Sequence, residues 1–78
     1  MSGWSLDAAI TMERRHILEG EMRVSRQEAL VQKLILKGHE ELAIRATDLL
    51  GLLREFVAFA KERLRTLEQR PVGQPDRN

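Results

Sequence analysis

Glu13 and His16 are the residues of this sequence whose types and spacing could bind a metal ion. They stand three positions apart, so in a helix their side chains would lie on one face, about one turn apart. Carboxylate-bridged dimetal sites inside helix bundles use two Glu-x-x-His pairs and two further glutamates. The chain contains one such pair. A homodimer would supply the second pair by symmetry, and Glu62 is the candidate for the further carboxylate.

The predicted surroundings of Glu13 do not favour a metal ion. In an antiparallel helical hairpin Glu13 should lie opposite the region around Leu64, where the charged residues are mostly basic. His16 falls beside the apolar stripe of its helix and not within it. We therefore predict that the pair belongs to a solvated helix surface, with no metal and no cofactor. A metal-binding bundle that uses Glu13, His16 and Glu62 stays as an alternative hypothesis.

Composition excludes several other kinds of chemistry. The chain has no cysteine and no tyrosine, and it has no glycine-rich loop that could cradle a phosphate. We predict that it is not an enzyme. Thirteen basic residues against twelve acidic ones give a net charge of +1, which offers no concentrated basic face for nucleic acid. A nucleic-acid-associated regulator is kept as a further alternative, although we expect neither nucleic acid nor membrane as a partner.

The short length of the chain predicts a need for association. A domain of 78 residues buries a smaller fraction of its surface than a larger domain does, and without cysteine it has no disulfides to compensate. A homodimer is therefore the leading expectation. The first residues lack the basic and apolar regions of a signal peptide, and no apolar run is long enough for a membrane span. These features favour the cytoplasm.

Helix signals divide the chain into two long segments. Ser5 or Asp7 can cap a first helix over about residues 6–36. Gly38 suits the left-handed conformation that ends helices, and His39 lies beside it in the turn. A second helix should run over about residues 40–69. The fold class is then all-α, with one antiparallel hairpin domain over residues 1–70 and a disordered tail over 71–78.

Heptad spacing predicts which side of the first helix is packed. Ile10, Ile17, Val24 and Val31 recur every seven residues and take the first core position, whereas Glu13, Gly20, Gln27 and Leu34 take the second. Glycine costs a helix about 1 kcal/mol relative to alanine. We therefore expect Gly20 to accommodate a bulky side chain from another helix, such as Phe56 or Phe59. The alternative is a neutral glycine on the helix surface. Gln27 is expected either to pair with its symmetry mate and fix the register, or to bond water at the rim.

The second helix is apolar over much more of its circumference, which predicts burial on several sides. Two adjoining rows of apolar residues are present, and further apolar side chains extend them. One neighbouring helix cannot cover such a surface, so two hairpins should pack into a four-helix bundle. The predicted subunit interface consists of Leu49, Leu50, Leu52, Leu53, Phe56, Val57, Phe59, Ala60 and Leu64.

Residues 15–43 resemble a group of short, uncharacterised bacterial helical-hairpin proteins. The matching pattern is His-Ile-x-Glu-Gly-Glu, then Arg-Gln, then an apolar run that ends in Gly-His. It is carried by His16, Ile17, Glu19, Gly20, Glu21, Arg26, Gln27, Gly38 and His39. The chain departs from the pattern after Gly-His, where Glu40 and Glu41 stand in place of Asp-Thr. The resemblance implies a helical hairpin and no particular activity.

These observations favour a small interaction or structural module. It would act through self-association and through a protein partner that the sequence does not identify.

Overall fold

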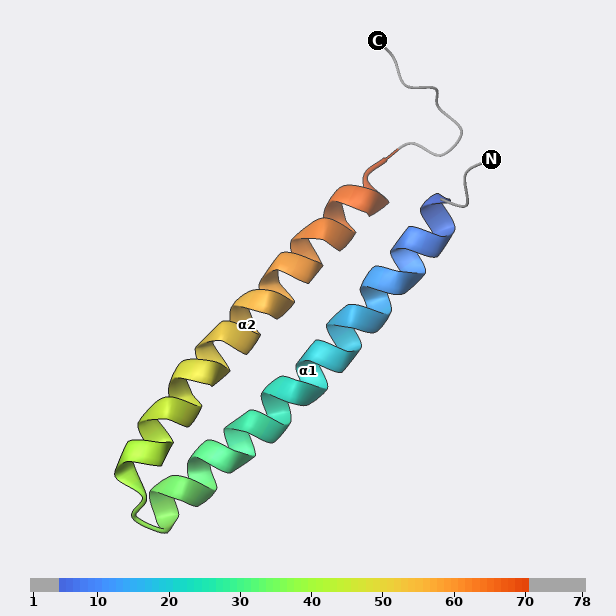
Figure 1. The fold of residues 1–78 in the computed structure, drawn as a ribbon. Coiled ribbons are helices and arrows are strands. Elements are labelled where there is room, and N and C mark those ends of the chain that lie inside the picture. Colours follow the sequence, from blue (N-terminus) through green and yellow to red (C-terminus); the bar gives the residue numbers. More distant parts are fainter. Residues whose placement is uncertain (1–4, 71–78) are drawn as a thin grey trace.

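The computed structural model describes residues 5–70, which form two antiparallel helices joined by a short turn (Figure 1). Helix α1 spans Leu6–Leu36 and helix α2 spans Glu40–Glu68. No strand occurs within the described residues. The predicted all-α hairpin is therefore confirmed, although α2 ends one residue before the predicted boundary. The predicted disordered tail, residues 71–78, lies outside the described residues, as do residues 1–4.

The start of α1 is fixed by Ser5. Its backbone is extended, and its hydroxyl oxygen accepts a hydrogen bond of 3.1 Å from the backbone N–H of Ala8. This bond satisfies one of the amide groups that have no partner in the first turn of a helix. Asp7, the other candidate cap, is the acidic residue of the first turn and complements the positive end of the helix dipole.

The turn between the helices is a Schellman motif centred on Gly38. The φ angle of Gly38 is +81°, in the left-handed region that glycine adopts without steric cost. The backbone N–H of Gly38 donates to the carbonyl of Ile35 at 3.0 Å, and that of His39 donates to Leu34 at 2.9 Å. These two bonds satisfy carbonyls left free at the end of α1. The chain therefore reverses direction within three residues.

Helix α2 begins without a side-chain cap. His39 is the capping residue, and its side chain makes no capping hydrogen bond. Its backbone carbonyl accepts from the N–H of Ala43 at 2.9 Å. Glu40 and Glu41 lie in the first turn, where their charge complements the helix dipole.

The core lies along one line between the helices. On α1 the residues that face α2 are those of the predicted heptad, with Gly20 buried and its seven companions half-buried. On α2 the facing positions also repeat at intervals of three and four. They are Ala43, Ala46, Leu50, Leu53, Val57, Ala60, Leu64 and Leu67.

This core is thin. The buried hydrophobic residues among those described are Ala43, Ala46, Leu50, Val57 and Ala60, and three of these are alanines. A fully buried large side chain contributes about 1.5–3 kcal/mol, whereas alanine contributes much less. The contact between α1 and α2 is thus a weak source of folding energy for a domain that must offset the entropy of two long helices.

Within residues 5–70, neither helix carries an apolar stretch sufficient to cross a bilayer.

Candidate functional site

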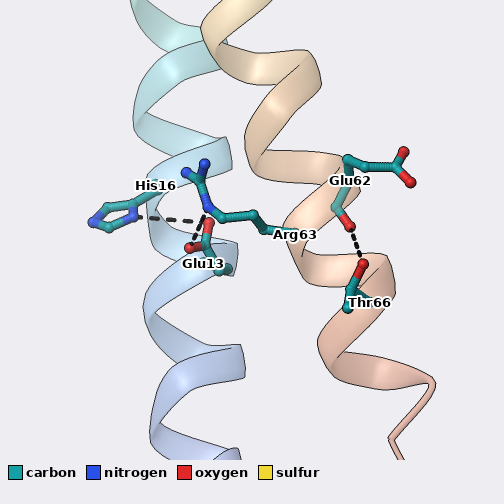
Figure 2. A network of polar contacts seen from close by, with 5 residues as sticks. All are labelled: Glu13, His16, Glu62, Arg63 and Thr66. Atoms are coloured by element: carbon teal, nitrogen blue, oxygen red, sulfur yellow. Dashed lines mark hydrogen bonds and ion pairs between the residues drawn. The ribbon is translucent and has the colours of Figure 1, made fainter.

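The side chain of Glu13 extends from α1 toward the guanidinium group of Arg63 on α2 (Figure 2). Its Oε2 atom accepts a hydrogen bond of 3.0 Å from the Nε–H of Arg63. Its Oε1 atom is buried and has no hydrogen-bond partner, with His16 Nδ1 at 3.9 Å. The Glu13 side chain is 15% exposed, whereas that of Arg63 is 53% exposed. Glu13 is thus held at the edge of the core by one charge-assisted hydrogen bond.

Glu62 does not join this group. Figure 2 shows its side chain pointing away from Glu13, and its carboxylate pairs instead with Arg65 at 3.2 Å. Arg63 lies at the edge of the contact with α1, next to the facing residue Leu64. Glu62 lies about 100° further around the helix and therefore points outward. Within residues 5–70 no cluster of three or more potential metal ligands occurs. The alternative metal site built on Glu13, His16 and Glu62 therefore does not assemble within one chain.

Gly20 lies against Val57 of α2. A Cβ atom placed on Gly20 would come within 2.7 Å of Val57 Cγ2, closer than packed atoms approach. The predicted close packing of Gly20 is confirmed, but the neighbouring side chain is Val57 and not Phe56 or Phe59, because the atoms within 4 Å of that Cβ position belong to Val57. A valine fits because Ala60 beside it is small and lets the helices approach, whereas a phenyl ring would hold them apart.

Gln27 bonds across the hairpin. Its Nε2 donates a hydrogen bond of 2.9 Å to the backbone carbonyl of Ala46 on α2. A carbonyl oxygen has two lone pairs, so Ala46 can accept this bond in addition to its own helix bond. This contact within the hairpin was not among the predicted arrangements of Gln27. Pairing with a symmetry mate and bonding to water at the rim stay predictions. The bond fixes the register of α1 against α2.

One side of the contact between the helices is closed by ion pairs, and we call it the ion-paired side. Arg14 meets Glu68 at 2.9 Å, and Lys61 meets Glu21 at 3.1 Å. A third pair joins Arg54 and Glu28. On each helix these residues are seven positions apart, which places them in one row beside the core.

The other side of α2 carries apolar side chains that α1 does not cover. Two heptad rows lie opposite the ion-paired side, and we define the α2 outer face as their part between positions 42 and 59, namely Leu42, Arg45, Leu49, Leu52, Phe56 and Phe59. Beyond this part the same rows continue with Arg63 and Thr66. All six residues of the α2 outer face are exposed, and Arg45 is its charged member. The rows adjoin each other on the helix surface, so the five apolar side chains form one stripe.

The predicted subunit interface is divided by the structure. Leu50, Val57 and Ala60 are buried between α1 and α2, so they are unavailable to a second hairpin. Leu53 and Leu64 are half-buried in the same contact. The remaining predicted residues, Leu49, Leu52, Phe56 and Phe59, belong to the α2 outer face.

Two hollows adjoin the α2 outer face. A groove of about 630 Å³ lies near the open end of the hairpin, with Met12, Phe59 and Leu67 among its lining residues. A second hollow of about 370 Å³ lies further along the hairpin, with Gly20, Arg23 and Phe56 among its lining residues. Each provides a recess into which an apolar side chain could insert.

The ion-paired side was not anticipated from the sequence, although a signal for it exists. Arg14, Glu21 and Glu28 recur every seven residues beside the predicted core positions of the first helix. Arg54, Lys61 and Glu68 recur in the same way on the second. Because the two helices are antiparallel, the first residue of one row meets the last residue of the other, and every charge then meets an opposite charge. The uncovered side of α2 is the side that lies away from these pairs.

No family model, no curated protein and no solved structure matches this chain. The resemblance to short bacterial hairpin proteins therefore stays a prediction. Functional inference rests on the geometry of the hairpin.

Proposed function

We propose that this chain is a small helical interaction module whose working form is a homodimer. Two hairpins would pack through their α2 outer faces and form a four-helix bundle. The module has no chemistry of its own in this proposal and acts by presenting surfaces of the assembled bundle.

The observation that carries the proposal is the composition of the α2 outer face. Leu42, Leu49, Leu52, Phe56 and Phe59 form one exposed stripe along α2. Contiguous apolar patches of this kind mark interaction sites on soluble proteins. Covering large apolar side chains is worth about 1.5–3 kcal/mol each. That gain is comparable to the total stability of many small domains, and the hairpin buries few large side chains by itself.

The direction of approach follows from the charges. The ion-paired side presents carboxylates and basic groups already matched between α1 and α2. A second hairpin that approached there would have to desolvate these groups, which is costly. The α2 outer face contains no carboxylate and offers apolar surface instead. Two-fold pairing lets this surface cover itself, and it is the commonest arrangement of soluble oligomers.

A protein partner could still bind the assembled bundle through α1. Leu18 and Met22 lie one turn apart on α1, away from α2, and are 61% and 49% exposed. Methionine adapts its shape to varied apolar surfaces. We propose this outer part of α1 as the surface for a heterologous partner, since pairing through α2 would leave it uncovered.

The proposal is tested by a matched pair of substitutions in α2. Leu52 belongs to the α2 outer face and Ile44 to a different face, yet their exposed fractions are 63% and 61%. Leu52→Glu should yield monomers or unfolded chains, because two buried carboxylates would oppose pairing. Ile44→Glu should leave the dimer intact. Static light scattering gives the mass of each variant, and equal dissociation by both substitutions would contradict the proposal.

A further inference from the structure

We propose that the two α2 helices meet in antiparallel orientation, about a two-fold axis that passes beside Leu50 and Gly51. This inference rests on the proposed homodimer and specifies which residues of the α2 outer face oppose each other.

The spacing of the residues on the α2 outer face carries the inference. An antiparallel axis between positions 50 and 51 places Leu49 level with the partner's Leu52. The same axis places Leu42 level with the partner's Phe59, and Arg45 level with the partner's Phe56. Each of the six residues of the α2 outer face then lies opposite a residue of the partner's α2 outer face. Each leucine meets an apolar side chain, and each arginine meets an aromatic ring, which attracts a guanidinium group.

A parallel arrangement gives the same residues less favourable contacts. Each side chain would then meet its own copy, so Arg45 would oppose the partner's Arg45 inside an apolar contact. Two like charges so placed destabilise the contact. The antiparallel arrangement separates the two arginines by the distance between positions 45 and 56 along the helix.

The ends of α2 favour the same orientation. The first turn of α2 is acidic, with Glu40 and Glu41, whereas its last turn contains Arg65. With the axis between positions 50 and 51, antiparallel pairing brings Glu40 of each α2 helix level with the partner's Lys61. It also opposes the two helix dipoles. Parallel pairing would place Glu40 and Glu41 beside the partner's Glu40 and Glu41.

The absence of cysteine from the chain permits a direct test by cross-linking. Leu42→Cys and Phe59→Cys are prepared separately, and each is checked by circular dichroism and light scattering. Each variant is then oxidised alone and as an equimolar mixture in which subunits have exchanged. The antiparallel arrangement predicts a disulfide-linked heterodimer in the mixture and none in either variant alone. Mass spectrometry identifies which chains are joined.

Other outcomes separate the inference from the proposed function. Self-linked Leu42→Cys or Phe59→Cys would overturn the antiparallel orientation while leaving the dimer in place. A dimer that forms no link in any sample would overturn the use of this face. A monomeric wild-type chain would overturn the homodimer itself. If either variant fails to fold, Arg45→Cys mixed with Phe56→Cys tests the same orientation, and Ile44→Cys serves as the control outside the contact.

Discussion

Gly20 and Val57 set the closest approach between the two helices, because a Cβ atom on Gly20 would lie 2.7 Å from Val57 Cγ2. Valine in a helix holds almost one rotamer, so this methyl group cannot swing away. The glycine is therefore a packing residue, and its cost to the helix is offset by close contact between α1 and α2.

Gly20→Ala should destabilise the fold despite the better helix propensity of alanine. The propensity gain is about 1 kcal/mol, and overpacking in a rigid contact costs roughly 1–3 kcal/mol. Val57→Ala in the same chain should remove the clash. The double variant should then be more stable than Gly20→Ala alone. Thermal unfolding at one protein concentration measures both, and a higher melting temperature for Gly20→Ala than for wild type would refute the close packing.

Glu13→Leu should raise stability, by about 1 kcal/mol, because a partly buried ion pair is replaced by apolar packing. Arg63 is well exposed and can return to water. Glu21→Leu is the matched control. Glu21 also pairs across the helices, but its side chain is 50% exposed, so the new leucine would stay in water. Denaturant unfolding should show a gain for Glu13→Leu and none for Glu21→Leu. A loss in the first variant would show that the carboxylate itself is required.

Gln27→Glu should destabilise the fold at neutral pH by roughly 1–3 kcal/mol, because a carboxylate cannot donate to the Ala46 carbonyl and its charge is repelled by that oxygen in a part-buried contact. A protonated glutamic acid can donate again. Because the folded state disfavours the carboxylate form, it raises the pKa of the introduced group above the ordinary glutamate pKa of about 4.3. The difference from wild type should therefore shrink as the pH falls toward about 4.3 and be smallest below it. Comparing both proteins at each pH removes the effect of acid on the other ion pairs. A difference that does not change with pH would contradict the role given to this hydrogen bond.

The ends of the helices could be predicted from sequence because they depend on local chemistry. Ser5 caps α1, and Gly38 supplies the positive φ angle that the turn requires. The packed side of α1 could also be predicted. It has one apolar stripe, so its heptad admits one orientation.

The packed side of α2 could not be read from its own sequence. Leu49 and Leu50 are adjacent and chemically identical, yet Leu50 is buried and Leu49 exposed. The choice depends on α1. The helices pack closely where Gly20 meets Val57, and the charged rows of the two helices must also meet. These are long-range relationships between residues 26 or more positions apart. A local sequence pattern contains only one residue of each pair.

The mass of the wild-type chain in solution tests the central claim most directly. Sedimentation equilibrium across a range of micromolar concentrations should give about twice the 9.0 kDa of one chain. The melting temperature should rise with protein concentration, because folding is coupled to association. A mass of 9.0 kDa at every concentration, with a constant melting temperature, would contradict the homodimer.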